Sequence, residues 1–493
     1  MFGTALINLI KGEMKDFTFI SGSLFFSSLL INTAITITTC IFGIFISIFI
    51  WTYFEKGYKK IFLAVLLCAL IPPFIHVHSW IKTMDAFNAL IDGFLGISMN
   101  FTGIGAVILT SSFSYLPFTI SFCLLGLLSI PVEMTDMMKT EIKPVTLFFK
   151  GIMPYFAPYV FISGIFIFLI TMNDFAISSA FGVNVFALEL FSLFSASGNL
   201  YAIALSSVPV IVLSVILLIF LGKITKRYDM TGDPVTNSNP YKKEMFMKIS
   251  AWVGCLLFVL FAAIPAGSML IESFYTKDFF LILTDSWSEL GYSFWISGVT
   301  AATSVVFSVL LAYSWYHSRK KMRLVLLLAF PFLIPSAILG LSLIVFWNSD
   351  VLSTVYRNPV MPAIGLSIRF CIFSILFFTV RLQKIEKNLM EAIQISYSFL
   401  KGFFQVLIPM IWKDILACLL LIFALAMGEY GIVLLITPPG YQMLTIKIYN
   451  YLHYGASEVV FALNFFVFIL VLIIGIIIFT LYKPENDLKA GSK

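Results

Sequence analysis

Long apolar segments separated by short polar segments occupy almost the whole chain. An apolar run of about 18 to 20 residues can cross roughly 30 Å of hydrocarbon as a helix. A lipid-exposed segment must satisfy its own backbone hydrogen bonds, and the alternating pattern of barrel strands is absent, so these segments are predicted to be helical. The pattern predicts about eleven membrane-spanning helices, at residues 24–52, 61–80, 103–128, 155–175, 201–222, 248–271, 293–316, 324–347, 362–381, 411–436 and 459–482.

The composition places these helices in a membrane. Of the 493 residues, 60% are hydrophobic and 11% are charged, and the mean hydropathy is +1.01. We therefore predict an all-α, polytopic membrane protein in contact with lipid. The net charge of +6 alone would allow a nucleic-acid partner. The basic residues lie in loops and follow membrane topology, however, so no nucleic-acid partner is expected.

The cysteines and the loop charges constrain the protein further. No cysteine belongs to a CxxC pair, so neither a zinc site nor a disulfide framework is indicated, and no metal site is expected. Most of the 31 Lys and Arg residues fall in loops on one side of the predicted membrane. That side is predicted to be cytoplasmic, which puts the N-terminus outside and the C-terminus inside. The loops on that side are 55–60, 131–154, 223–247, 317–323, 382–410 and the C-terminal tail.

Two stretches of the chain match each other without a gap. Residues 134–154 align with residues 389–409 at an offset of 255, and the spans that follow continue the match. Self-similarity at a fixed offset indicates a duplicated unit. The aligned pairs are Phe148/Phe403, Phe149/Phe404, Pro154/Pro409, Met172/Met427, Asp174/Glu429, Phe175/Tyr430 and Ile177/Ile432.

A polar linker divides the chain into two halves. Residues 223–247 are rich in charge and turn-forming residues, and they separate residues 1–222 from residues 248–493. The predicted span at 248–271 has no counterpart in the first half, so the halves are expected to hold five and six spans.

Each half carries a polar loop that ends at a proline before a span. Residues 388–404 are predicted to form one short amphipathic helix, suited to the membrane surface or to a groove on a partner. A single loop of this kind would be explained as well by an ordinary connection between helices. Two such loops at equal spacing favour a functional role.

The two loops resemble the EAA loop of permease subunits in bacterial ABC importers, which reads Glu-Ala-Ala, then Gly, then an apolar stretch ending in Leu-Pro. MEAIQIS…VLIP is the closer copy, although Ser396 stands where Gly is usual and Met390 where the first Glu is usual. TDMMKTE…GIMP is the weaker copy, with Glu141 at the Gly position. The resemblance implies that the coupling residues are Asp136, Met137, Glu141, Pro154, Glu391, Ala392, Ser396 and Pro409.

A second element is similar to permeases for ferric iron, thiamine, sulfate, phosphonate and polyamines. Residues 427–456, MGEYGIVLLITPPGYQMLTIKIYNYLHYGA, resemble their Gly-Asp/Glu-Phe-Gly segment and the Thr-Leu…Ile-Tyr stretch after it. The resemblance implies a two-half transport subunit in a bacterial inner membrane, not an enzyme. It would bind no cofactor itself, because homodimeric ATPase subunits bind the ATP, and an extracytoplasmic binding protein would deliver the solute. Ferric iron is the first expectation for that solute and thiamine the second.

The chain contains no GxxxxGK[ST] loop and no grouping of Ser, His and Asp or of Cys and His that indicates catalysis. Charged or polar groups at helix depth are the candidates for a translocation path or gate. His76 and His78 allow a metal-ligand interpretation, but interfacial polar residues are the simpler one. A secondary transporter driven by an ion gradient and a polytopic membrane enzyme remain the alternatives. The path candidates are Asn173, Asp174, Arg369 and Glu429.

Overall fold

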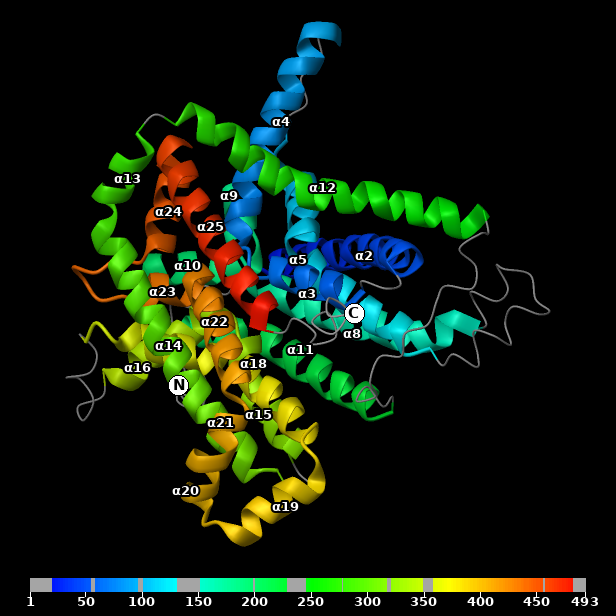
Figure 1. Ribbon diagram of the computed structural model, residues 1–493. Coiled ribbons are helices and arrows are strands. Elements are labelled where there is room, and N and C mark those ends of the chain that lie inside the picture. The colour runs from blue at the N-terminus through cyan, green and yellow to red at the C-terminus, as the bar shows by residue number, and fades with distance from the viewer. Residues whose placement is uncertain are drawn as a thin grey trace. The chain divides into compact units, whose positions relative to one another are not determined.

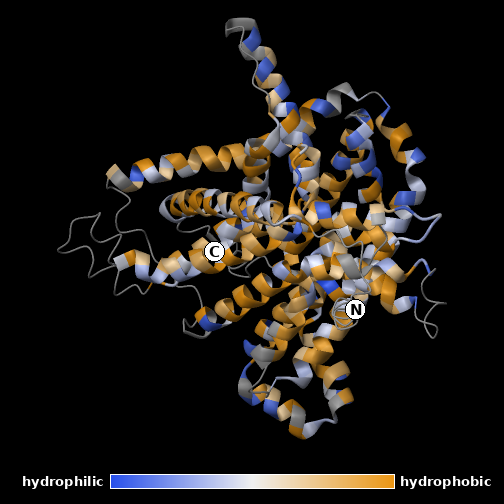
Figure 2. Cartoon of the chain, turned by 180° about the vertical axis from the view of Figure 1, so that it is seen from behind, coloured by the Kyte–Doolittle hydropathy of each residue, from blue (hydrophilic) through white to orange (hydrophobic). Residues whose placement is uncertain are grey.

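All regular structure in the described part of the chain is helical in the computed structural model, which confirms the all-α prediction (Figure 1). Among the described residues, eight helices are long and apolar enough to span a membrane, or up to ten if each of two bent helix pairs counts as one span. The hydrophobic residues dominate these helices (Figure 2). The structure describes residues 20–54, 58–95, 101–130, 151–197, 200–227, 245–276, 278–316, 321–348, 358–454 and 457–481.

The predicted count of eleven spans is not confirmed, because prolines interrupt some of the apolar segments. The segment predicted at 324–347 is broken at Pro335 into α15 (Lys321–Leu333) and α16 (Ser336–Trp347). Helices of 13 and 12 residues are about 18 to 20 Å long, short of the hydrocarbon thickness. Prolines also separate α3 (Tyr58–Cys68) from α4 (Pro73–Leu95), and the two are bent by 87°.

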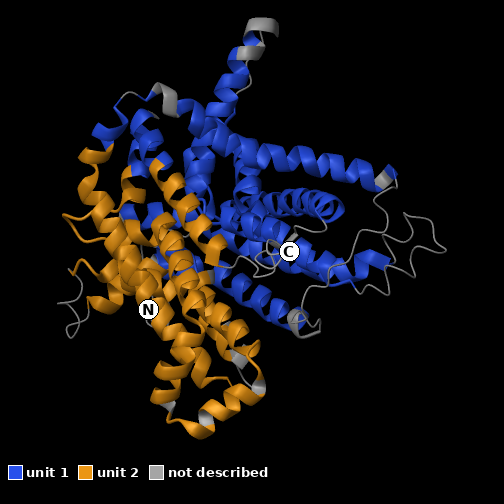
Figure 3. Cartoon of the chain, in the orientation of Figure 1, with its two compact units in different colours: residues 1–282, 333–338, 448–465 blue, residues 283–332, 339–447, 466–493 orange. Residues whose placement is uncertain are grey.

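The chain forms two compact units (Figure 3). Unit 1 comprises residues 1–282, 333–338 and 448–465, and unit 2 comprises residues 283–332, 339–447 and 466–493. The long helices of unit 1 are α2 (Gly22–Tyr53), α5 (Gly103–Leu128), α8 (Met153–Asn173), α11 (Leu200–Arg227) and α12 (Met245–Tyr275). Those of unit 2 are α14 (Trp287–Ser314), α18 (Met361–Gln383) and α22 (Trp412–Gly428), and α25 is Ser457–Leu481.

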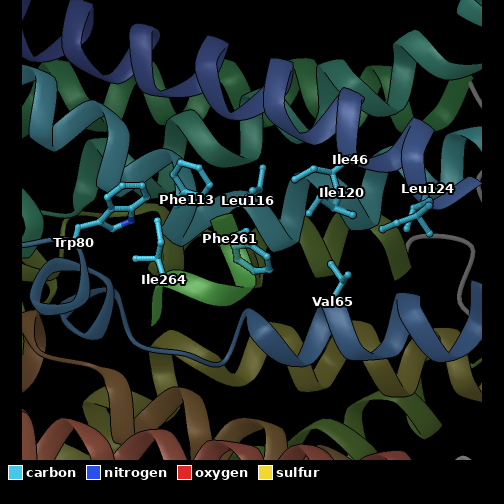
Figure 4. Packing of buried hydrophobic residues seen from close by; sticks show 10 residues of the cluster. Ile46, Val65, Trp80, Phe113, Leu116, Ile120, Leu124, Phe261 and Ile264 are labelled. Carbon is cyan, nitrogen blue, oxygen red and sulfur yellow. The ribbon is translucent and has the colours of Figure 1, made fainter. Parts of the chain in front are cut away.

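The core of unit 1 is built from side chains of five helices (Figure 4). Ile46 of α2 and Leu116 of α5 are fully buried, and Trp80 of α4 packs against Phe113 with ring centroids 5.0 Å apart. Phe261 brings α12 into the same cluster. This core fixes α5, which carries one of the site residues described below.

In unit 2, small polar residues hold α14 against α18. The hydroxyls of Ser308 and Ser374 are 2.6 Å apart, and those of Thr303 and Ser367 are 2.7 Å apart. Small residues let two helix backbones approach closely inside a membrane, and their hydroxyls hydrogen-bond across the contact. The contact fixes the rotation of α18 and therefore the position of Arg369 on it.

The order of elements after each repeated proline is the same in both copies. In the first copy, α8 is followed by the short helix α9 (Ala176–Ala180), then by α10 (Phe186–Ser197) and α11. In the second copy, α22 is followed by the short helix α23 (Gly431–Ile436), then by α24 (Leu444–Tyr454) and α25.

Candidate functional site

Each repeated proline follows a π-helical turn. Gly151 and Ile152 are π-helical before Pro154, and residues Gly402–Leu407 form a π-helix before Pro409. Proline lacks an N–H and clashes with the carbonyl four residues earlier, so an ordinary α-helical turn is unfavourable at this point. In the second copy the N–H of Ile408 instead donates to the carbonyl of Phe403, five residues earlier. The widened turn accommodates the duplicated proline in both copies.

The predicted continuous helix over 388–404 is wrong. The chain leaves the helical conformation at Tyr397, with φ −131° and ψ 146°, which separates α19 (Lys387–Ser396) from α20 (Phe399–Lys401). The physical reason is a tertiary contact, because α19 folds back onto the π-turn. A Cβ on Gly402 would lie only 2.9 Å from Cγ2 of Ile393, so glycine is needed for this approach. Met390 and Ile393 are buried as a result, with 0% and 3% exposure.

The same loop leaves other apolar side chains exposed. Ile395, Leu400 and Phe404 are 86%, 62% and 62% exposed, and Leu389 is 43% exposed. We call these four residues the exposed loop side chains. Exposed large apolar groups indicate contact with lipid or with a partner protein. Of the predicted coupling residues in this copy, Ala392 and Ser396 are also exposed, and Glu391 is half-buried.

The loop runs from α18 into α22, an ion pair joins these two helices to each other, and an aromatic contact joins the loop to α14. Nε of Arg381, at the end of α18, lies 2.7 Å from Oδ2 of Asp414, in the first turn of α22. The rings of Tyr313 in α14 and Phe403 have centroids 5.7 Å apart. A displacement of the loop would therefore be transmitted to α14, α18 and α22. The corresponding first-half residues Asp136, Met137 and Glu141 lie outside the described residues.

The two aligned acidic residues occupy equivalent backbone positions. Asp174 follows the last residue of α8 with ψ 133°, and Glu429 follows the last residue of α22 with ψ 132°. Each carboxylate then accepts a hydrogen bond from the start of the next short helix. Asp174 accepts from the N–H of Ala176 at 2.9 Å, and Glu429 from the N–H of Ile432 at 3.4 Å. A side-chain oxygen at this point satisfies an N–H that the helix itself leaves unpaired.

A different side chain meets each of these carboxylates. The Tyr115 hydroxyl donates to Oδ2 of Asp174 at 2.5 Å. Arg369 pairs with Glu429, with Nε 3.7 Å from Oε2. Tyr115 on α5 corresponds at the 255-residue offset to position 370, next to Arg369 on α18. The first copy thus holds its carboxylate with a neutral phenol and the second with a cation.

Arg369 is held by few direct contacts. Its side chain is 11% exposed, and its guanidinium lies 5.6 Å from the ring centroid of Phe332. Its Nε and Nη1 atoms donate no hydrogen bond to any described residue. Asn173, by contrast, is buried, and its Nδ2 donates to the carbonyl of Leu169 at 2.8 Å. Arg369 of α18 and Glu429 after α22 therefore form a largely buried ion pair within unit 2.

His76 and His78 are both buried within unit 1, with 1% and 4% exposure, and not exposed at an interface. Nε2 of His78 lies 2.7 Å from Oε2 of Glu272, whose other oxygen is 3.3 Å from Nζ of Lys82. This group joins α4 to α12. Over the described residues, no three His, Cys, Asp or Glu side chains gather as a metal site would require.

No model of a known protein family matches the chain, and no curated protein matches it. The function is therefore inferred from the residues and their arrangement.

Proposed function

We propose that the chain is the transmembrane permease of an ATP-driven importer. The observation that carries the proposal is the loop at 382–410 in unit 2. It combines a proline-linked π-turn, also found at the aligned position of the first copy, with exposed apolar side chains and an attachment to three spans. A loop that only connects two helices needs no such exposed side chains.

In this proposal the exposed loop side chains contact an ATPase subunit on the cytoplasmic side. A second ATPase subunit contacts the first-half loop, so the duplicated chain provides one docking site for each subunit of an ATPase homodimer. Closure of the ATPase pair moves each loop, and the loop moves its spans as rigid bodies. ATP is bound by the partner subunits alone.

The repeated carboxylates Asp174 and Glu429 and the Arg369 side chain are proposed to line the translocation path or its gate. A charge inside a membrane-spanning segment is unfavourable by at least a few kcal/mol, so such groups are usually functional. The solute arrives on an extracytoplasmic binding protein at a bacterial inner membrane. Ferric iron and thiamine are the proposed solutes, as the sequence resemblance implies.

The test is coupled transport with a variant of the loop. The chain is reconstituted in proteoliposomes with the ATPase encoded in the neighbouring reading frame, and ATP hydrolysis and solute uptake are measured together. Phe404→Ala is expected to reduce the stimulation of ATP hydrolysis by the permease about tenfold, because side chains of this size are typical of energetically dominant contacts. Phe280→Ala removes a Phe that is 80% exposed on α13 (Phe279–Asp285), and it serves as the matched control.

Two results would contradict the proposal. One is unchanged coupling in Phe404→Ala together with unchanged association of the ATPase. The other is uptake that follows an ion gradient and continues without any ATPase, which would favour the secondary transporter.

A further inference from the structure

Unit 2 contains a cavity of about 730 Å³ that has no part in the ATPase contact. Its walls come from the first turns of α14 and α24 and from the loop 437–443 between α23 and α24. Small-molecule sites in proteins enclose about 300–1,000 Å³. The volume therefore suits a whole small molecule better than a single side chain.

The loop that forms one wall has a fixed conformation. Pro439 and Gly440 occupy the centre of a tight turn closed by the N–H of Tyr441 on the carbonyl of Pro438 at 3.2 Å. Gly440 has φ +90°, the left-handed conformation that this turn requires at its third position. At the end of the loop, the N–H of Leu444 donates to the Ser293 hydroxyl of α14 at 2.7 Å. A wall fixed in this way lowers the entropic penalty of binding a ligand.

Two tyrosines supply the aromatic part of the lining. Tyr292 and Tyr441 have ring centroids 5.0 Å apart at an interplanar angle of 34°. The Tyr292 hydroxyl donates to the carbonyl of Pro359 at 2.9 Å, which fixes its ring. Tyr441 is 48% exposed, so part of its ring is open to a ligand. Aromatic faces attract cations, and the attraction grows as water is excluded.

The lining side chains carry one formal charge, the carboxylate of Glu289. Lys447, which lies outside the lining, is 3.2 Å from Oε1 of Glu289, and the Ser288 hydroxyl donates to Oε2 at 2.9 Å. Nζ of Lys447 also donates to the carbonyl of Asp285 at 3.2 Å, so this ammonium group is held at the end of α13. A carboxylate can accept about four hydrogen bonds, which leaves capacity for a ligand donor.

This wall is a feature of the second copy. The first copy joins α9 to α10 through the five residues 181–185, whereas the second joins α23 to α24 through the seven residues 437–443. The Pro-Pro-Gly-Tyr turn has no equivalent in the shorter loop. The duplication alone therefore does not account for the cavity.

We propose that this cavity binds a small organic cation, with its charge between the Glu289 carboxylate and the Tyr441 ring and its apolar part against Tyr292. The inference depends on the geometry of unit 2 and not on the import function. Binding to the chain without any ATPase is therefore its direct consequence.

The test is ligand binding to the purified full chain in nanodiscs, measured by isothermal titration with thiamine, arginine and choline as probes. At least one of the three is expected to bind saturably, and an uncharged aromatic alcohol, benzyl alcohol, is expected to bind at least tenfold more weakly. Tyr441→Ala is expected to weaken cation binding about three- to tenfold, the range of a partly exposed cation–π contact. Glu289→Gln, which keeps the shape of the side chain, is expected to weaken it at least as much.

Tyr454→Ala removes a tyrosine that is 84% exposed and outside the lining, and it should leave the affinity unchanged. Three results would overturn the proposal: no saturable binding of any cation, equal binding of benzyl alcohol, or binding that neither Tyr441→Ala nor Glu289→Gln alters. Unchanged coupling in the Phe404→Ala experiment, which would contradict the import proposal, would leave the cation site standing.

Discussion

At the residue scale, the two copies hold aligned carboxylates with different chemistry. Asp174 accepts a hydrogen bond from the neutral Tyr115, whereas Glu429 lies 3.7 Å from the cationic Arg369. A hydrogen bond to a charged group contributes about 1.5–3 kcal/mol. Removal of one member of a largely buried ion pair is more unfavourable, at about 3–5 kcal/mol, because a charge is left without a partner. The loss of Arg369 should therefore lower the stability of the protein more than the loss of the Tyr115 hydroxyl does.

We predict that Arg369→Gln lowers the midpoint of thermal unfolding more than Tyr115→Phe does, both measured in the same detergent. The expected losses of stability are about 3–5 kcal/mol for Arg369→Gln and about 1.5–3 kcal/mol for Tyr115→Phe. Adding Glu429→Gln to Arg369→Gln should recover most of the loss, because the paired amides leave no buried charge. An equal effect of the two single variants, or no recovery in the double variant, would contradict this account of the pair.

At the element scale, the π-turn connects the loop of unit 2 to α22. The helical segment Gly402–Met410, which contains Pro409, and the helix Trp412–Gly428 are bent by 76° relative to each other. A π-turn holds one residue more than an α-helical turn, so its loss would rotate the preceding residues by about 100°. Such a rotation would remove Ile393 from its contact with Gly402 and turn the exposed loop side chains to a new direction.

We predict that Pro409→Ala reduces the coupling of ATP hydrolysis to uptake severalfold while the chain still inserts into the membrane. The substitution restores the N–H and removes the clash that favours the π-turn. Pro209→Ala is the matched control, because Pro209 lies inside α11, where the helix is α-helical throughout. Coupling and insertion are measured in the same proteoliposomes, and a Pro409→Ala variant that couples as well as Pro209→Ala would exclude a role for the turn.

The sequence predicts these elements only in part, and the reasons are physical. The match of Pro154 to Pro409 indicates where both π-turns lie, because the missing N–H of a proline affects backbone hydrogen bonding only within its own helical turn. The break at Tyr397 depends on the contact of Ile393 with Gly402, a tertiary contact that local periodicity does not contain. Tyr115 is an aromatic residue within an apolar span. The sequence distinguishes it only by its alignment, at the 255-residue offset, with position 370 next to Arg369.

At the scale of the whole molecule, the fold class follows from hydropathy, whereas the span count does not. Apolar length predicts helices wherever the chain has no break, as in α2, α5 and α14. Some prolines divide the same length into shorter helices, as at Pro335, whereas others lie inside an unbroken helix, as Pro209 does in α11. Hydropathy averages over such breaks, so it overstates the number of uninterrupted spans.

The orientation of unit 2 gives the last prediction. Tyr313 near one end of α14 contacts Phe403 in the loop, whereas Glu289 at the other end lines the cavity. The 28 residues of α14 measure about 42 Å, more than the roughly 30 Å of hydrocarbon. The loop and the cavity should therefore lie on opposite sides of the membrane, and the basic residues of the loop predict that the loop is on the cytoplasmic side.

We test this with single cysteines in a chain whose six native cysteines are replaced. Tyr441→Cys should react with a membrane-impermeant maleimide in intact cells, and Ile395→Cys only in inside-out vesicles. Both native side chains are well exposed, at 48% and 86%, so reactivity reports the side of the membrane and not burial. Labelling of both cysteines from the same side would show that α14 does not cross the membrane. Labelling with the sides exchanged would place the proposed ATPase contact outside the cell, where no ATP-driven subunit could act on it.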